Sequence, residues 1–320
     1  MIVSAPRQNN LAIESNMITI YHRTKEGEKL QELPEFKPGS IVCVEKPTTT
    51  ELEQLAEVYK LDPGHLKDAV DPYEVPRLEP EEGKLYIFAR APFKKDGAVI
   101  TVPVLLIYAE DFVMAVSRFE LPFIERVVID KDFYSTQRPK VLIKIFFEIN
   151  RLYNNFLIDI SRQVRNASGK LEQIENKDIL NLVVFETVIN DFLGALVPAN
   201  AIIAKLLSGR FVKFEADQDL VEDLYLAENQ LVDLSRATLK MINNIREAYS
   251  TIMTHNLNRV LKMLASLTVV LTIPTIVGSF FGMNVSLPFA GSAHTFSIIL
   301  IFTLVFSLMT FWLFKRNKWL

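Results

Sequence analysis

Two uncharged apolar runs near the C-terminus constrain the fold of this chain more than any other feature of its sequence. Met263 to Phe281 and Phe296 to Phe314 each hold 19 residues without an acidic or basic side chain. A helix of that length is long enough to cross ~30 Å of hydrocarbon. The connecting loop, residues 282–295, is too short to fold by itself. The sequence therefore predicts a membrane hairpin, and the alternative is two buried helices of a soluble domain.

Basic residues flank the two runs on one side only. The loop between the runs carries neither Lys, Arg, Asp nor Glu, whereas the outer flanks carry Arg259, Lys262, Lys315, Arg316 and Lys318. Lys and Arg favour the cytoplasmic side of a membrane. We therefore expect a two-span protein of the cell membrane, inner or plasma, with both termini in the cytoplasm. The N-terminal residues lack the pattern of a signal peptide.

Composition and short motifs give no sign of an enzyme. The net charge of -3 gives no electrostatic footprint for nucleic acid, and the single cysteine, Cys43, allows neither a disulfide nor a Cys-based zinc site. "SGK" at 168–170 lacks the upstream glycine of a phosphate-binding loop, so no use of ATP and no organic cofactor are expected. The four histidines are far apart in sequence, with no HExxH spacing: His22, His65, His255 and His294.

The chain is predicted to be an α+β protein, with an α/β domain at 1–130 and a helical region at 131–209. Short β-branched and aromatic runs predict strands at 17–23, 40–46, 84–91, 102–109 and 112–118. A helix is expected at 50–61, with Thr50 as its N-cap and Glu53 completing a capping box, and a short helix within 62–70. Within 131–209 the sequence predicts a helix over 140–164 that ends near Gly169. It also predicts a helical stretch over 177–207 that is interrupted by Gly194 and Pro198.

A third helical segment, 210–281, runs directly into the first span, which we place at about 261–281. Its 64 residues between Gly209 and Pro274 contain neither Gly nor Pro, and an unbroken helix of that length is ~95 Å long. Two apolar heptad seams follow it, which favours self-association or packing on the preceding helices. The seams are Leu224, Leu231, Thr238, Ile245 and Ile252, and Ala227, Leu234, Met241, Ala248 and His255. The loop 282–295, the second span 296–314 and a basic cytoplasmic tail, 315–320, complete the chain.

The first span carries hydroxyl side chains at helical spacing. Thr268, Thr272, Thr275 and Ser279 are 4, 3 and 4 residues apart, which places them on one helix face. The same face extends through Ala265, Leu261 and Asn258 on the cytoplasmic side, and through Gly282 and the adjoining Asn284 on the other. Such a stripe indicates either a helix–helix contact or a water-filled lumen.

A lumen requires several copies of the chain, because two helices cannot enclose one. In a ring, each Asn284 would offer an uncharged amide oxygen at the outer mouth. This suits a hard cation that keeps its water shell, as Mg²⁺ does. A membrane potential of 100 mV supplies ~4.6 kcal/mol for a divalent ion, so inward movement would need no ATP.

Several segments together resemble the CorA family of divalent cation transporters. These are "FFGMNV" (280–285) at the end of the first span, Pro274 eight residues before the glycine, the terminal "KRNKWL", "HLKDAVDPYEVPRLE" (65–79) and "DLYLAENQLVD" (223–233). The resemblance covers most of the chain. It implies a homopentamer in which a funnel of cytoplasmic α/β domains and long helices continues into the membrane and surrounds a Mg²⁺ pathway.

The resemblance also implies roles for particular residues. Gly282, Met283 and Asn284 would form the outer selectivity ring, with the hydrated ion held by Asn284. Asp68 and Asp223 would bind a regulatory Mg²⁺ between neighbouring cytoplasmic domains, so Mg²⁺ would be both substrate and regulator. The expected partners are other copies of the chain and membrane lipid. The pore lining expected from the stripe and the resemblance is Asn258, Leu261, Leu264, Ala265, Thr268, Thr272, Thr275 and Ser279.

Three departures from the family pattern bear on function. Phe281 stands where the family usually has Tyr, the outer loop lacks an acidic residue, and Lys67 stands beside Asp68 where a second acid is common. The sequence predicts transport of Mg²⁺, with Co²⁺ and Ni²⁺ as further substrates, gated by cytosolic Mg²⁺. The alternatives are a relative specialised for Zn²⁺ or another transition metal, and a membrane-anchored sensor or scaffold that conducts nothing.

Overall fold

The structure, a computed structural model, describes residues 17–23, 30–169, 174–208, 215–284, 294–317 and 319. It divides into two compact units. The first comprises the described residues of Met1–Lys170 and Glu175–Asn243, and the second those of Leu171–Ile174 and Asn244–Leu320.

A seven-stranded sheet forms the centre of the first unit. Its strands are β1 (Ile18–His22), β2 (Gln31–Leu33), β3 (Ser40–Glu45), β4 (Arg77–Glu81), β5 (Lys84–Lys95), β6 (Ala98–Tyr108) and β7 (Phe112–Ser117). Their order across the sheet is β2-β1-β3-β7-β6-β5-β4. Neighbouring strands are antiparallel except for β3 and β7, whose parallel pairing sets Ser40 opposite Phe112. The sheet is thus two antiparallel parts joined by one parallel pair.

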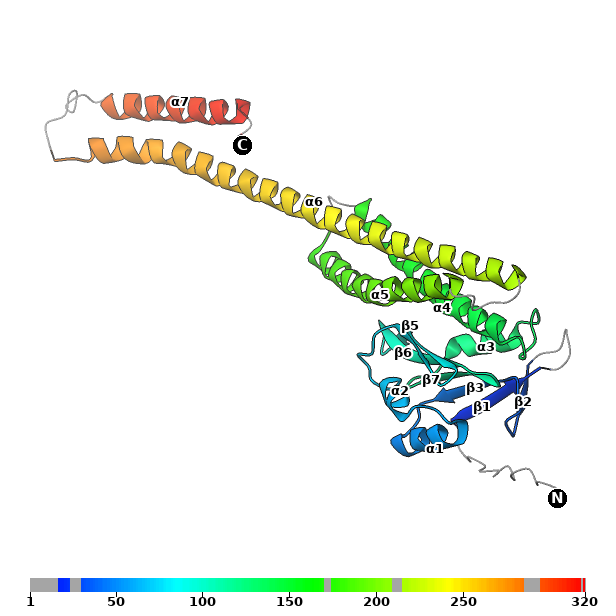
Figure 1. The fold of residues 1–320 in the computed structure, drawn as a ribbon. Helices are drawn as coiled ribbons and strands as arrows, with labels where there is room; N and C mark the ends of the chain where they lie inside the picture. The colour runs from blue at the N-terminus through cyan, green and yellow to red at the C-terminus, as the bar shows by residue number, and fades with distance from the viewer. Residues whose placement is uncertain are drawn as a thin grey trace, which may run out of the picture. The chain divides into compact units, whose positions relative to one another are not determined.

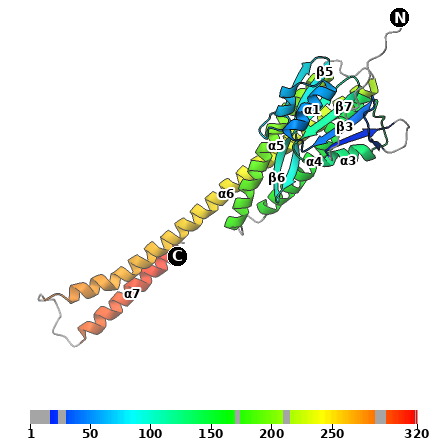
Figure 2. The same cartoon turned by 90° about the horizontal axis from the view of Figure 1, so that it is seen from below.

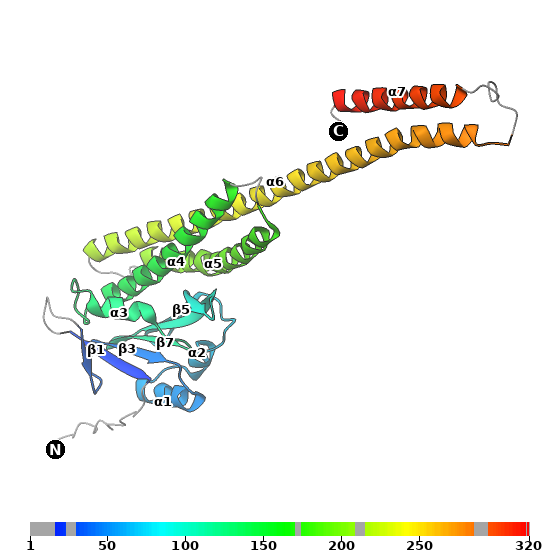
Figure 3. The same ribbon diagram turned by 180° about the vertical axis from the view of Figure 1, so that it is seen from behind.

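Helices cover both faces of this sheet, as Figures 1 and 3 show. One face carries α1 (Thr49–Tyr59) and α2 (Pro63–Asp68). The other carries α3 (Pro122–Ile129), α4 (Arg138–Ser168) and α5 (Asn176–Ser208). The core under α1 and α2 is fully buried and includes Leu55, Leu66, Leu105 and Met114, each at 0% exposure. Burying one such side chain stabilises the fold by about 1.5–3 kcal/mol.

The five strands expected from the sequence all form, but three short elements were not predicted. The β2 strand has only three residues, and β4 reads "RLEPE", which lacks β-branched and aromatic residues. The α3 helix spans only two turns. These segments are held by pairing and packing with their neighbours and carry too weak a local signal to be recognised.

The predicted N-cap of α1 was wrong by two residues. Thr48, not Thr50, caps the helix, and Glu51, not Glu53, completes the capping box. The Glu51 carboxylate accepts a hydrogen bond from the Thr48 amide at 2.8 Å, and the Thr48 hydroxyl accepts one from the Glu51 amide at 3.4 Å. Thr48 and Thr50 each have a glutamate three residues later, so the spacing alone does not decide between the two caps.

The predicted interruption of the second long helix was also wrong, because α5 runs unbroken from Asn176 to Ser208 with Pro198 inside it. A proline within a helix clashes with the carbonyl four residues earlier, which here belongs to Gly194. A methyl group at Gly194 would have no neighbour within 4 Å. The helix accommodates both residues and continues past them.

The long helix α6 (Glu215–Phe281) contributes to both units. Within the first unit its first heptad seam packs inside the chain, since Leu224, Leu231 and Thr238 are 1%, 5% and 4% exposed. The Thr238 hydroxyl lies 2.8 Å from the Ser161 hydroxyl of α4, and the Asn200 amide of α5 donates to Asn229 at 2.6 Å. This part of the seam therefore packs on the preceding helices.

In the second unit, α7 (Thr295–Arg316) lies beside the C-terminal part of α6 (Figures 1 and 2). Most of their apolar side chains are exposed, among them Leu271, Phe280, Phe302 and Val305. Across the described residues, α5, α6 and α7 are the helices long and apolar enough to cross a membrane. Of these, α5 buries Phe192 and Ile203 within the first unit. The apolar surfaces of α6 and α7 remain open.

Candidate functional site

The predicted polar face of the first span lies on a continuous helix. Because α6 is helical to Phe281, residues spaced alternately three and four apart share one face. Every residue expected to line the pore, from Asn258 to Ser279, is exposed in the single chain. The two leucines of this set, Leu261 and Leu264, are 53% and 51% exposed.

The threonine hydroxyls of this face are hydrogen-bonded within their own helix. Thr268 donates to the carbonyl of Leu264 at 2.9 Å, Thr272 to that of Thr268 at 2.7 Å, and Thr275 to that of Leu271 at 3.1 Å. A hydroxyl has one proton and two lone pairs, so each oxygen keeps acceptor capacity only. The face thus presents acceptor oxygens and no free hydroxyl protons from these three residues.

A different face of α6 is covered within the hairpin. Ser266 is fully buried, and Val270, Ile273 and Val277, on the same face, are less exposed than their neighbours. On α7 the most covered residue is Thr303, which is 8% exposed and shares its face with Ile299 and Ser307. Small residues such as Ser and Thr allow membrane helices to approach closely. The contact between α6 and α7 thus uses the Ser266 face, and the Thr268–Thr272–Thr275 face is left without a partner in the chain.

The helix α6 ends at the predicted selectivity motif. The Gly282 amide donates to the carbonyl of Gly278 at 3.0 Å, and the Met283 amide to that of Phe280 at 3.4 Å. A methyl group on Gly282 would lie 3.2 Å from the Gly278 carbonyl oxygen, which is closer than almost all real contacts of this kind. Met283 and Asn284 are exposed beyond the helix end. The remainder of the predicted outer loop, 285–293, lies outside the described residues.

The predicted regulatory acid Asp68 is already paired within the chain. Its carboxylate accepts a hydrogen bond from Arg77 at 2.7 Å, and the same guanidinium also pairs with Glu74 and, at 2.6 Å, with Glu79. The guanidinium stacks on the ring of Phe88, 3.8 Å from its centroid. Burial tends to lower the pKa of Arg77, but the hydrogen bonds that it donates to three carboxylates raise it overall. A cation binding to Asp68 would have to compete with this guanidinium.

The second predicted regulatory acid, Asp223, is exposed on α6. No hydrogen bond or ion pair joins it to Asp68 in the part of the chain that the structure describes. One turn further along α6, Glu228 is only 1% exposed and faces Asn150 and Tyr153 of α4. Burial raises the pKa of the Glu228 carboxyl to about 8. Its Oε2 atom has no hydrogen-bond partner among the described residues.

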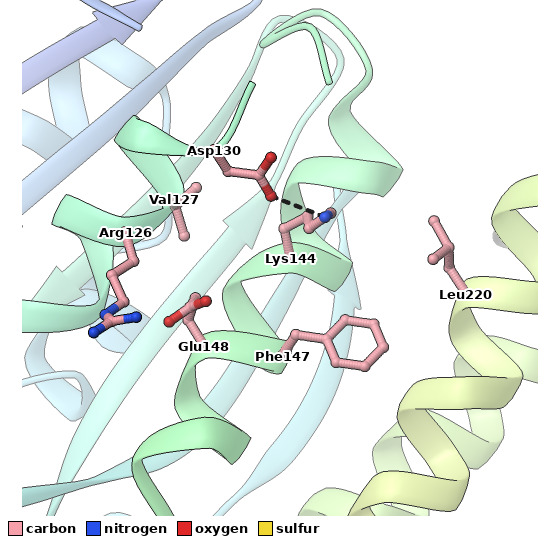
Figure 4. Close-up of a pocket in the computed structure, with 7 residues that line it drawn as sticks. All are labelled: Arg126, Val127, Asp130, Lys144, Phe147, Glu148 and Leu220. Carbon is pink, nitrogen blue, oxygen red and sulfur yellow. Dashed lines mark hydrogen bonds and ion pairs between the residues drawn. The ribbon is translucent and has the colours of Figure 1, made fainter. Parts of the chain in front are cut away.

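A charged pocket between α3, α4 and α6 is shown in Figure 4. The Asp130 carboxylate accepts a hydrogen bond from the Lys144 ammonium at 2.8 Å, and Glu148 accepts one from Arg151 at 2.6 Å. Burial of Asp130 acts to raise its pKa, but the hydrogen bonds and positive charge of its neighbours outweigh this and lower the pKa. Both acids of this pocket are therefore already paired with cations of the chain.

Residues 40–316 match the family model described as CorA-like Mg²⁺ transporter protein. Because the match spans most of the chain, the chain belongs to this family, and it is a divalent cation transporter associated with a membrane. The chain is 24% identical, over 95% of its own length and the whole of the relative, to the cobalt/magnesium transport protein CorA of Methanocaldococcus jannaschii.

Two solved structures have the same fold as this chain. The complete structure of the CorA magnesium transporter from M. jannaschii matches with a TM-score of 0.84 at 18% identity, covering 96% of this chain and 99% of that one. The full-length CmaX protein matches with a TM-score of 0.72 at 16% identity, covering 95% and 97%. The α+β architecture predicted from the sequence is thereby confirmed.

Sequence reasoning missed three features of the candidate sites. They are the guanidinium that pairs with Asp68, the buried Glu228, and the serine and threonine contact between α6 and α7. Arg77 lies nine residues from Asp68 on a strand that was not recognised, so no local spacing connected the two. Glu228 could have been found from its sequence position, four residues after Leu224 on the buried seam.

Proposed function

We propose that several copies of this chain, five by the family resemblance, surround a pathway for hydrated Mg²⁺, with Co²⁺ and Ni²⁺ as further substrates. The pathway runs along the α6 face from Asn258 to Ser279, with Gly282, Met283 and Asn284 at its outer mouth. The two apolar helices α6 and α7 span the membrane, both termini are cytoplasmic, and the membrane potential drives inward movement. Mg²⁺ on the cytoplasmic side closes the pathway.

One observation carries this proposal. The hairpin contact uses the Ser266 face of α6, so the Thr268–Thr272–Thr275 face is not explained by packing on α7. A hairpin that only anchored the chain in a membrane would not require a continuous polar face that no other helix of the chain covers. A ring of copies places that face around a lumen.

The donor pattern of the face favours a cation that keeps its water. Since the three threonine hydroxyls give their protons to backbone carbonyls, their oxygens accept hydrogen bonds and cannot donate. Water molecules bound to a cation turn their hydrogens outward, so acceptor oxygens complement the outside of the hydrated ion. Mg²⁺ loses its water reluctantly and is suited to this kind of surface.

A flux assay in proteoliposomes tests the pathway. Asn284→Ala is expected to reduce Mg²⁺ uptake by tenfold or more, and the isosteric triple variant Thr268→Val, Thr272→Val, Thr275→Val to reduce it severalfold. Matched controls on α7 are Asn317→Ala, beyond the end of a helix, and Thr310→Val, whose hydroxyl also bonds to its own helix. Unchanged uptake by both Asn284→Ala and the triple threonine variant in correctly assembled protein would refute the pathway.

The same assay distinguishes the competing functions. A membrane-anchored scaffold gives no flux of any cation in the wild-type protein. A transporter specialised for Zn²⁺ takes up Zn²⁺ in strong preference to Mg²⁺. Comparing Mg²⁺, Co²⁺, Ni²⁺ and Zn²⁺ at equal concentration and potential therefore decides among the three.

The proposed gate rests on Asp68 and Asp223. The double variant Asp68→Ala, Asp223→Ala is expected to make uptake insensitive to internal Mg²⁺, whereas Asp233→Ala, an exposed acid elsewhere on α6, retains inhibition. Because Arg77 competes for Asp68, Arg77→Gln is expected to shift inhibition to lower Mg²⁺ concentrations. Inhibition of the double variant at wild-type concentrations would show that these two residues are not the sensor.

A further inference from the structure

A histidine and three carboxylates converge between α2 and β4, outside the residues proposed for transport or gating. Asp62 is the N-cap of α2, and His65 lies in that helix. Glu79 and Glu81 are two residues apart on β4, so they point to the same side of the strand. One ligand atom from each of Asp62, His65 and Glu81 lies within 4.8 Å of the other two.

The imidazole of His65 is held in place by its surroundings. Its side chain is only 12% exposed. It packs on the rings of Tyr86 and Phe88, with centroids 4.4 and 5.9 Å away. The Tyr86 hydroxyl in turn accepts a hydrogen bond from the Asp62 amide at 3.1 Å. One nitrogen, Nε2, is directed at the two glutamates, which are 43% and 47% exposed and so remain accessible from solvent.

The distances from this nitrogen are those of neighbouring ligands around one metal ion. Nε2 lies 2.9 Å from a Glu81 oxygen and 3.4 Å from a Glu79 oxygen. Ligand atoms ~2.0–2.1 Å from a tetrahedral Zn²⁺ ion are ~3.3 Å apart. Both distances from Nε2 are thus within about 0.5 Å of the spacing that two ligands of one ion require, and a ligand atom of Asp62 lies within 4.8 Å of those of His65 and Glu81.

A supporting contact fixes one of the glutamates from outside. The second oxygen of Glu79 accepts a hydrogen bond from Arg77 at 2.6 Å. Such outer contacts orient the ligands of metal sites. The guanidinium also offsets part of the negative charge of the three carboxylates, which would otherwise repel one another.

We propose that His65, Glu79, Glu81 and Asp62 form a binding site for one transition-metal cation of the Zn²⁺, Co²⁺ or Ni²⁺ class. An imidazole nitrogen beside carboxylates suits these ions, whereas Mg²⁺ is bound through oxygen. The site is distinct in chemistry from the oxygen-lined pathway and from the Asp68 and Asp223 acids. Its existence does not depend on whether the chain conducts Mg²⁺.

Metal titration of the full chain in detergent tests this site. Mg²⁺ is kept in large excess to fill oxygen-only sites, and Co²⁺ is added while its visible absorption is followed. We expect one saturable Co²⁺ site per chain, with the intense absorption of a four-coordinate ion, and its displacement by an equimolar amount of Zn²⁺. Absence of such a site in the wild-type protein overturns the proposal.

Variants assign the site to these residues. His65→Gln and Glu81→Gln are each expected to weaken Co²⁺ binding at least tenfold, and the double variant to abolish it. His255→Gln, an exposed histidine on α6, is the matched control and keeps the site. Glu81→Gln changes a half-exposed side chain, so it tests the proposal even where His65→Gln loses stability. Wild-type affinity in both single variants places the metal elsewhere and refutes the assignment.

Discussion

The sheet core of the first unit and the hairpin of the second differ in how far their leucine and phenylalanine side chains are exposed. Leu105 on β6 is 0% exposed and Phe88 on β5 is 1% exposed, whereas Leu304 and Phe302 on α7 are 54% and 66% exposed. The first unit buries its apolar side chains within the chain and derives its stability from them. The hairpin leaves most of its apolar surface exposed in the single chain, so burial within the chain contributes little to its stability.

One matched pair of substitutions tests this difference in burial and has the largest expected effect on stability. Leu105→Ala is expected to lower the free energy of unfolding by about 2–5 kcal/mol, because it leaves a cavity in a closed core. Leu304→Ala removes the same atoms from an exposed position and is expected to change it by less than ~0.5 kcal/mol. Denaturant unfolding of both variants in detergent measures the difference. Equal losses would show that the hairpin has a closed core of its own.

A second test concerns the polar interior of the first unit. The pKa of Glu228 is raised from 4.5 to about 8 in the folded chain. Below pH 4.5 the carboxyl is protonated in both folded and unfolded states, so it does not oppose folding. As the pH rises towards 8, the unfolded chain releases this proton and the folded chain retains it. The free energy of unfolding therefore falls over this window, and the loss is complete above about pH 8.

Glu228→Gln is expected to remove this dependence on pH. The variant gains about 1–3 kcal/mol over the wild type at alkaline pH, because it has no carboxylate charge to bury there. The two proteins are expected to unfold alike near pH 4. Denaturant unfolding across a pH series measures this, with the exposed Glu222→Gln as control. A slope that persists in Glu228→Gln would assign the pH dependence to another group.

The smallest expected effect contrasts the two faces of α6. Ser266→Leu inserts bulk at a fully buried position and is expected to destabilise the hairpin by about 1–2 kcal/mol. Thr272→Leu places the same side chain on the face without a partner, and we expect less than ~0.5 kcal/mol. Thermal unfolding of both variants as isolated chains in detergent measures the two losses of stability. Equal destabilisation would mean that the Thr272 face is also packed.

The long apolar segments were the most predictable part of the fold. The lengths of the two spans and the Gly-Pro-free run leading into the first gave α6 and α7 to within a few residues. Predictions depending on a single local signal were less accurate. The choice among Thr48 and its two following threonines needed the geometry of Glu51, and Pro198 within a helical stretch did not reveal whether the helix would end there.

The candidate site was predictable only where its residues lie on one element. Helical spacing alone placed Asn258, Thr268 and Ser279 on a common face. The pairing of Asp68 with Arg77 joins a helix to a strand that the sequence did not reveal, and the covered Ser266 face becomes visible only when α7 is laid beside α6. Contacts between elements distant in sequence have no periodic signature.

The internal hydrogen bonds of the threonines have a consequence for how such a protein is made. A hydroxyl that already bonds to its own helix carries little penalty in hydrocarbon. A single newly synthesised hairpin can therefore enter the bilayer with its polar face turned towards lipid, before any other copy is present. For the assembly proposed above, insertion and association would then be separate steps, with the polar face against lipid until neighbouring copies enclose it.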